Sequence, residues 1–281
     1  MTPLAPKRSS TRAKTPGARK TRGIAARDLS GEVKKSARRN AKPPVVRVDP
    51  KVKPPRRWLK RLVVWSLATV VLISLFPIFL GLAYWPSFAK PVSTLMVADM
   101  VRGQSPKRDW VALEDISPVV WQSVISSEDG QFCAHHGVDW KEVEGVVDDL
   151  LEGESPRGAS TLAMQTAKNL FLWPQRSYIR KGLEVPLALY IDWLWGKKRL
   201  MEVYLNIAEW GPNIYGIEAA ARHHFNRSAG KLSRRQAALL AVTLPNPKLR
   251  NPAKPKRGLN RLARLNERRA RQSGAYVKCL R

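Results

Sequence analysis

"RLMEVYLNIAEW", residues 199–210, places four side chains at positions i, i+3, i+4 and i+7: Leu200, Val203, Tyr204 and Ile207. Residues with this spacing lie on one face of an α-helix, so the stretch predicts an amphipathic helix with one buried face. Helical apolar spacing continues through most of residues 90–280, and alternating β-branched runs are scarce. The sequence therefore predicts a mainly α domain.

Neighbouring stretches support this fold class. "SRRQAALLAVTL", residues 233–244, begins with a capping serine and continues with strong helix formers. Only the region 92–112 is compatible with a short hairpin. Residues 254–281 predict a basic amphipathic helix with a loose end, and we interpret this helix as a solvated face near an anionic membrane.

Residues 62–89 contain no charged side chain. About 20 apolar residues suffice to cross a bilayer as a helix, and a cleavable signal peptide has a shorter apolar region. Aromatic residues near both ends suit the two membrane interfaces. Basic residues 56–61 precede the run and only Lys90 follows it closely, which places the N-terminus in the cytoplasm and residues 87–281 outside.

The N-terminal tail is strongly basic. The whole chain of 281 residues carries a net charge of +28, and up to Arg61 it holds 20 Lys and Arg against three acids. A stretch so poor in apolar residues is expected to be disordered. Nucleic-acid binding, attraction to anionic lipid and a solvated cytoplasmic extension all fit such a tail, and the membrane span favours the last two. We thus expect a disordered tail (1–57), a transmembrane helix with flanks (58–86) and an extracytoplasmic domain (87–281).

"SSEDGQFCAHHGVDW", residues 126–140, combines acids, a cysteine and two histidines. Zinc sites normally show two separated ligand pairs, whereas this stretch offers one cluster with adjacent histidines, so no metal site is predicted. A polar turn at Gly137 and a catalytic carboxylate at Glu128 remain open. Two cysteines do not make a disulfide framework, and sparse cysteine use favours unpaired Cys133 and Cys279.

Residues 157–184 predict two short helices separated by Pro174. On the first, capped by Ser160 or Thr161, polar residues recur at helical spacing. On the second, Arg176, Arg180 and Glu184 fall on one face beside Lys181. Surface ion pairs and a site for a polyanion such as a diphosphate explain this charge pattern equally well.

These stretches resemble motifs of the family 51 glycosyltransferases, the peptidoglycan polymerases. The similar segments occur in the family's order: "EDGQFCAHHGVD" (128–139), "GASTLAMQTAKNLF" (158–171), "RKGLE" (180–184), "YLNIAEWGPNIYGIEAAARHHF" (204–225) and "AALLAVTLPNPKLRNP" (237–252). Each motif is weak alone, but five in order are strongly specific. The chain ends soon after the last motif, so we expect a monofunctional member without a penicillin-binding domain.

The resemblance implies a lysozyme-like α-helical domain with a head and a membrane-facing jaw. It implies elongation of β-1,4-linked glycan strands from lipid II, with release of undecaprenyl diphosphate. Catalytic roles would fall on Glu128, as general base, and on Glu184. The substrate-binding positions would be Asp129, Ser160, Thr161, Gln165, Lys168, Arg176, Arg180, Lys181 and Asn206. Met164 stands where the family usually has a glutamine, and Ala163 where it often has Ser or Thr.

The expected chemistry agrees with these residues. A general base takes the proton from the attacking hydroxyl, and an apolar cleft that includes Phe132 would raise the pKa of Glu128 toward neutrality. The diphosphate leaving group needs charge compensation from the basic cluster. A divalent cation, Mg or Mn, near Glu184 or Asp129 is a further source that the sequence leaves open.

The expected partners are lipid II, the growing glycan strand, membrane lipids, and proteins of cell-wall synthesis and division, but not nucleic acid. The expected location is the inner membrane, crossed once, with the catalytic domain in the periplasm. The alternative enzyme is a lytic transglycosylase or hydrolase of peptidoglycan on a lysozyme-like fold. A non-enzymatic alternative is a membrane-tethered module whose tail binds DNA or an acidic partner.

Overall fold

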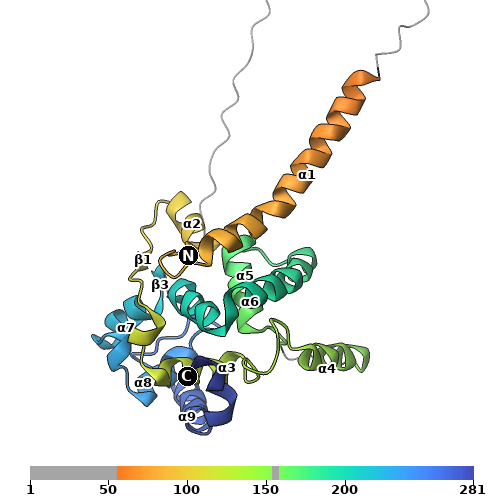
Figure 1. The fold of residues 1–281 in the computed structure, drawn as a ribbon. Coiled ribbons are helices and arrows are strands. Elements are labelled where there is room, and N and C mark those ends of the chain that lie inside the picture. The colour runs from red at the N-terminus through yellow and green to blue at the C-terminus, as the bar shows by residue number, and fades with distance from the viewer. Residues whose placement is uncertain (1–55, 154–157) are drawn as a thin grey trace, which may run out of the picture. The chain divides into compact units, whose positions relative to one another are not determined.

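The computed structural model describes residues 56–153 and 158–281, so the predicted tail lies almost entirely outside the described residues. The described part is mainly helical, as expected (Figure 1). Its helices are α1 (Arg57–Tyr84), α2 (Thr94–Val101), η1 (Leu113–Asp115), α3 (Pro118–Glu128), α4 (Trp140–Leu151), α5 (Leu162–Phe171), α6 (Tyr178–Ile207), α7 (Ile217–Phe225), η2 (Ala229–Lys231), α8 (Arg234–Ala241), α9 (Arg257–Arg271) and η3 (Gly274–Leu280). Its strands are β1 (Lys107–Arg108), β2 (Glu209–Gly211) and β3 (Ile214–Tyr215).

Helix α1 coincides with the apolar run. It has 28 residues, and its length and composition suit a membrane span. Almost all of its side chains are exposed, which a core helix of a soluble protein would not show. Its C-terminal part contacts α6, where the hydroxyl of Tyr190 donates to the carbonyl of Ile78 at 2.7 Å.

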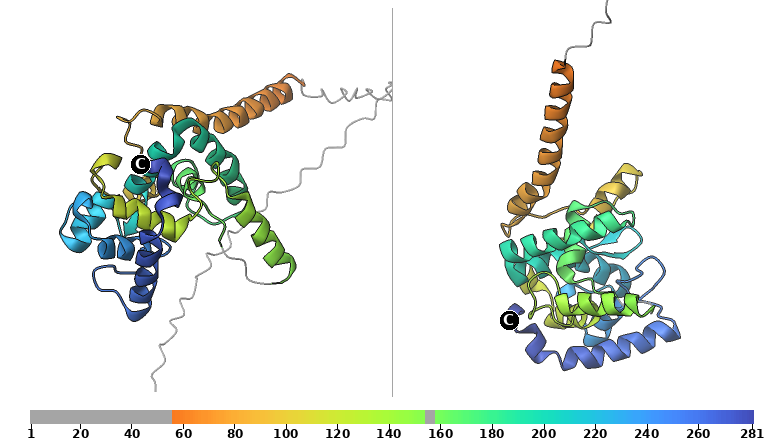
Figure 2. Two further views of the ribbon diagram at one scale, coloured as in Figure 1. Left: turned by 60° about the horizontal axis from the view of Figure 1, so that its bottom comes forward. Right: turned by 90° about the vertical axis from the view of Figure 1, so that its right-hand side faces the viewer.

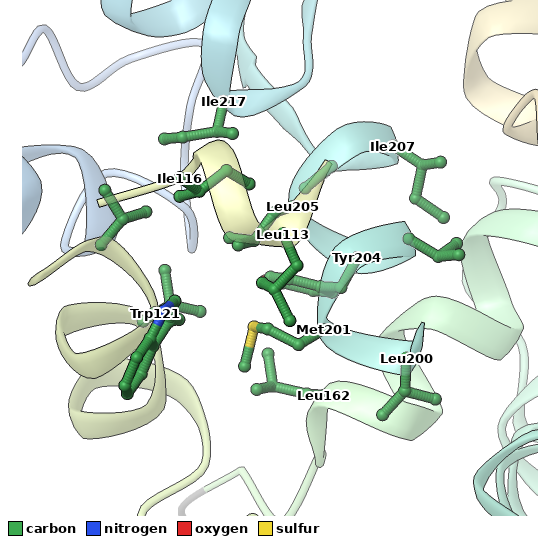
Figure 3. Packing of buried hydrophobic residues seen from close by; sticks show 14 of the residues in the cluster. Leu113, Ile116, Trp121, Leu162, Leu200, Met201, Tyr204, Leu205, Ile207 and Ile217 are labelled. Atoms are coloured by element: carbon green, nitrogen blue, oxygen red, sulfur yellow. The ribbon is translucent and has the colours of Figure 1, made fainter. Parts of the chain in front are cut away.

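The core is built around α6. Helices α5 and α6 pack along each other, and the periodic face read from residues 199–210 is fully buried. Figure 3 shows side chains from α3 (Trp121), α5 (Leu162) and α6 (Met201 and Tyr204) pointing into one common core. Helix α6 kinks at Gly196, whose φ of 67° favours glycine.

A second helical group consists of α3, α8 and α9, which pack on one another (Figures 1 and 2). The capping serine predicted for residues 233–244 is present, and it forms a full capping box, because the Ser233 and Gln236 side chains each bind the other's backbone N–H. The amide of Asn266 in α9 donates to the carbonyl of Ser123 in α3 at 2.9 Å. This group carries the C-terminal end of α3, where Glu128 lies.

Residues 92–112, the one region whose sequence is compatible with a short hairpin, do not form one. That region contains α2 and β1, and β1 pairs in parallel with β3 from the far end of the domain. The strand order is β1-β3-β2, with β2 antiparallel to β3. A local pattern could not reveal this pairing, since the partner strand lies about a hundred residues away.

The C-terminal stretch also differs from expectation. Helix α9 is amphipathic as predicted, but the end after it is not loose. Residues Val277 and Leu280 of η3 are buried in the main core, and Cys279 forms a disulfide with Cys133. The interpretation of both cysteines as unpaired is therefore wrong.

Candidate active site

Glu128 is the last residue of α3, and two polar side chains donate to its carboxylate. The hydroxyl of Ser127 donates to Oε1 at 3.1 Å, and the amide of Gln165 in α5 donates to Oε2 at 3.2 Å. The hydroxyl of Tyr204 in α6 donates to Oε1 of Gln165 at 3.1 Å. Tyr204 therefore fixes which end of the Gln165 amide faces Glu128.

The pKa of Glu128 is raised above its ordinary value. Burial is the largest cause, since it penalises the charged form, while the hydrogen bonds from Gln165 and Ser127 oppose the shift. The positive charges of Arg250 and Lys168 oppose it further. The raised pKa is the direction expected from the sequence, and it suits a carboxylate that accepts a proton near neutral pH.

Asp129 closes α3 and holds the next helix in place. Its Oδ2 accepts the backbone N–H of Leu162 at 2.9 Å, at the start of α5, and its Oδ1 contacts Nε2 of His135 at 2.8 Å. Both oxygens are thus engaged within the protein. Asp129 links the end of α3, the loop that follows it and the start of α5.

The same loop is fastened to α5 and α6 at Gly137. The hydroxyl of Thr161, which also caps α5 through the N–H of Met164, donates to the carbonyl of Gly137 at 2.6 Å. Gly137 has a φ of 77°, and a Cβ at this position would lie 2.7 Å from the carbonyl oxygen of Ala188. The turn predicted at Gly137 is therefore required for close packing against α6.

The basic cluster lies on α5 and around the start of α6. Glu184 is buried and accepts hydrogen bonds from the Arg180 guanidinium and from Nζ of Lys181, the latter at 2.9 Å. Lys181 also donates to Ser160 at 2.7 Å. Burial lowers the pKa of Lys168, while the carboxylates of Glu184 and Glu128 act in the opposite direction. The charges of both predicted catalytic acids therefore act on the pKa of Lys168.

Two cavities meet at Ser160. The first, called the Glu128 cavity, has a volume of about 660 Å³ and is lined by residues that include Glu128, Asp129, Ser160 and Thr161. The second, called the basic cavity, has a volume of about 780 Å³, and its lining includes Ser160, Gln165, Lys168, Arg176, Arg180, Lys181 and Glu184. Glu128 lies at the junction, since Gln165 of the basic cavity binds its carboxylate directly.

The carboxylates proposed to hold a divalent cation do not fit that task. Glu184 is bound by two cationic side chains, and both oxygens of Asp129 have protein partners. Over residues 56–153 and 158–281, no three His, Cys, Asp or Glu side chains gather into one cluster. The histidine motif serves instead to position Asp129, through His135.

The sequence of the domain that contains this site matches a known protein family. The sequence pattern of a family described as Transglycosylase matches residues 94–271, which contain both cavities' acids and cations. The chain belongs to the transglycosylase family. This membership was predicted from the five motifs, and the match confirms it.

Relatives in the transglycosylase family cover most of the chain. A biosynthetic peptidoglycan transglycosylase of Agrobacterium fabrum is 60% identical over 80% of this chain and 98% of its own length. Proteins with the same description from Brucella suis and Mesorhizobium japonicum are 58% and 59% identical, again over 80% of this chain. They are covered over 100% and 94% of their own lengths.

The transglycosylase fold brings together every predicted site residue except Asn206. The Asn206 side chain is fully buried and binds the backbone of Val111 and Glu202, so it supports the fold and lines neither cavity. Arg176 reaches the basic cavity, but it precedes α6 instead of lying on it, because α6 begins after the cap Ser177.

Sequence reasoning missed several residues of the site. Tyr204 was assigned to the core from its spacing, and its spacing gave no sign that its hydroxyl orients Gln165. Four residues from α9 and the segment after it line the Glu128 cavity: Arg269, Gln272, Ser273 and Tyr276. The one sequence feature that could have placed them there is the pairing of Cys279 with Cys133, five residues after Glu128.

Proposed function

We propose that this protein is a peptidoglycan glycosyltransferase that polymerises lipid II into β-1,4-linked glycan strands and releases undecaprenyl diphosphate, with Glu128 as general base. The observation that carries the proposal is the junction of the two cavities at Glu128 and Ser160. A base with a raised pKa lies beside a cavity lined by four cations. The named relatives are biosynthetic peptidoglycan transglycosylases, which supports the same reaction.

The chemistry follows from this arrangement. The Glu128 carboxylate takes the proton of the acceptor 4-hydroxyl as that oxygen attacks the anomeric carbon of the donor. The bond from the anomeric carbon to the diphosphate breaks, and the diphosphate leaves with its electron pair. Cations of the basic cavity stabilise the charge that develops on the phosphate oxygens. Arg180 and Lys181 share Glu184, which holds them in place and leaves Lys168 and Arg176 for phosphate.

The rim of the basic cavity suits a lipid diphosphate. Tyr178 and Ile179 line it and are 98% and 75% exposed, and Trp193 of the same helix is 81% exposed. Exposed apolar side chains beside cations favour a substrate with a charged head and an apolar tail at a bilayer surface. With α1 as anchor, we propose a single-pass inner-membrane protein whose described domain after α1 is periplasmic.

The cations of the basic cavity favour the proposed polymerase over the alternative, a lytic enzyme or hydrolase. Finished glycan carries no diphosphate at the cleaved bond, so four converging cations would serve no purpose there. Incubation with lipid II and with purified sacculi distinguishes the two reactions. We expect glycan strands from lipid II and no release of soluble fragments from sacculi.

The substitution Glu128→Gln tests the base. We expect glycan synthesis from lipid II in detergent to fall by at least about 10²-fold, the usual contribution of general base catalysis. The amide keeps the shape of the side chain, so thermal unfolding should show a folded protein. Polymerisation within a few-fold of the wild-type rate would overturn the proposed role of Glu128.

Substitutions in the basic cavity test the diphosphate site. Lys168→Ala and Arg176→Ala should each lower kcat/KM for lipid II by about 10-fold or more, because each removes a charge-assisted contact to phosphate. The exposed Lys254 lies outside both cavities, so Lys254→Ala is the matched control and should leave the rate unchanged. If Lys168→Ala and Arg176→Ala kept the wild-type kcat/KM, as Lys254→Ala should, the basic cluster would be only a solvated surface.

A further inference from the structure

The Glu128 cavity has a second wall that comes from the C-terminal end of the chain. Arg269 lies near the end of α9, Gln272 and Ser273 follow it, and Tyr276 lies in η3. All four side chains line the cavity that contains Glu128. The family match ends at residue 271, so three of these four residues lie beyond it.

The C-terminal segment that contains η3 has one face buried in the core and another face that lines the Glu128 cavity. Residues at i and i+3 lie nearly above one another in a 3₁₀ helix. Val277 and Leu280 form one such pair and are buried in the main core, which fixes the segment on the domain. Ser273 and Tyr276 show the same spacing and line the cavity, and the Tyr276 side chain stays 52% exposed.

A disulfide ties this wall to the loop that follows the proposed base. Cys279 is three residues after Tyr276, and it pairs with Cys133, which lies in the loop after Asp129. The backbone N–H of Cys279 also points to Sγ of Cys133 at 3.3 Å. The wall and the loop after Glu128 are therefore covalently joined on one side of the cavity.

The exposed groups of the wall match the chemistry of a sugar that carries a peptide. An aromatic ring at the edge of a polar cavity offers its face to the C–H groups of a sugar ring. Arg269 is exposed, and its guanidinium forms no ion pair with any described residue, which leaves it free for a carboxylate. The proposed function already assigns phosphate binding to the basic cavity, which shares Ser160 with the Glu128 cavity.

We propose that Arg269 and Tyr276 bind the acceptor in the Glu128 cavity, Tyr276 against its sugar and Arg269 on a carboxylate of its peptide, and that the Cys133–Cys279 disulfide holds this wall in register with Glu128. The inference rests on the proposed function, because it names residues for the acceptor of that reaction. Arg269 and Tyr276 are binding residues, while the disulfide is a positioning element.

The test measures initial rates of polymerisation by the full-length protein in detergent across a range of lipid II concentrations. Tyr276→Ala and Arg269→Ala should each raise KM about two- to tenfold with kcat nearly unchanged, since each removes one binding contact and leaves the base intact. Tyr276→Phe keeps the ring and should restore the wild-type KM. Arg268→Ala is the matched control, because Arg268 is an exposed neighbour on α9 that does not line the Glu128 cavity.

A second substrate separates the peptide contact from the sugar contact. Lipid II with amidated peptide carboxylates should raise KM for the wild type and for Tyr276→Ala, but not for Arg269→Ala. An equal rise in all three proteins would overturn the assignment of Arg269 to a carboxylate.

The double variant Cys133→Ser/Cys279→Ser tests the disulfide. Its KM for lipid II should rise, because the wall is no longer tied to the loop after Glu128. The fall in kcat/KM at low pH should occur at the same pH as in the wild type, because the groups that bind Glu128 are unchanged. If that variant fails to unfold cooperatively, the Tyr276 and Arg269 variants decide. Wild-type KM in both of them would overturn the inference and leave the proposed function standing. If the wild-type protein makes no glycan from lipid II, the proposed function itself is wrong and the inference falls with it.

Discussion

At the scale of single residues, the site depends on a short chain of hydrogen bonds through a glutamine. Tyr204 donates to Gln165, and Gln165 donates to Glu128. Burial raises the pKa of Tyr204 well above its ordinary value, so the phenol keeps its proton and acts as a donor. A fixed donor at Oε2 favours the ionised Glu128, while burial favours the neutral form. Together with Ser127, Arg250 and Lys168, these opposing effects set the pKa of Glu128, and so the pH range in which the proposed base is ionised.

The substitution Gln165→Leu should shift the pH dependence of polymerisation. Glu128 must be ionised to accept a proton, so kcat/KM falls as the pH drops through its pKa. Loss of the Gln165 hydrogen bond removes a contribution that lowers this pKa, and the acid limb should therefore move to higher pH. The measurement is the pH profile of kcat/KM for lipid II. Gln131→Leu, on a cavity residue without this bond, should leave the limb in place, and an unmoved limb in Gln165→Leu would contradict the network.

At the scale of elements, the start of α5 connects packing with catalysis. Thr161 caps the helix and binds the carbonyl of Gly137, and Asp129 binds the next N–H. Local spacing predicted a cap at Ser160 or Thr161 but could not choose between them. The structure assigns the cap to Thr161, while Ser160 faces both cavities and accepts from Lys181. Neighbouring residues of similar chemistry thus have separate tasks.

Thr161→Ala should destabilise the domain more than Ser160→Ala. Loss of the cap and of the buried bond to Gly137 should lower the free energy of unfolding by about 1–3 kcal/mol. Ser160→Ala removes one exposed contact and should change it by about 0.5 kcal/mol or less. Thermal unfolding in detergent compares the two variants. Equal losses would show that the cap does not hold α5 in place.

At the scale of the whole molecule, Arg199 joins the catalytic domain to the end of the apolar helix. Its buried guanidinium donates to the carbonyls of Tyr84 and Ala89 at 2.9 and 2.6 Å and forms an ion pair with Glu202 at 3.1 Å. The indole of Trp195 adds a bond to the carbonyl of Gly81 at 2.9 Å. These contacts hold the chain that leaves α1 against α6.

Arg199→Ala should therefore be strongly destabilising. It leaves the part-buried Glu202 carboxylate with the Trp110 indole as its one remaining described partner and removes the donor to the carbonyls of Tyr84 and Ala89, so the expected loss is about 3 kcal/mol. The neighbouring Lys198 is exposed, so Lys198→Ala serves as the control and should shift stability by less than about 0.5 kcal/mol. Thermal unfolding of the full chain in detergent gives both values. Similar midpoints for the two variants would mean that Arg199 does not join the two parts.

The sequence by itself determined the mainly helical class, the apolar span, the family and most of the candidate acids and cations. These features depend on spacing within short segments, and a helix brings residues three and four apart to one face wherever it lies. Tertiary structure alone decided the Cys133–Cys279 pair, the burial of Asn206, the parallel pairing of β1 with β3 and the C-terminal wall of the Glu128 cavity. Each of these joins segments far apart in the chain, by 146 positions for the two cysteines. Such contacts depend on how the helices pack, and no local pattern encodes that packing.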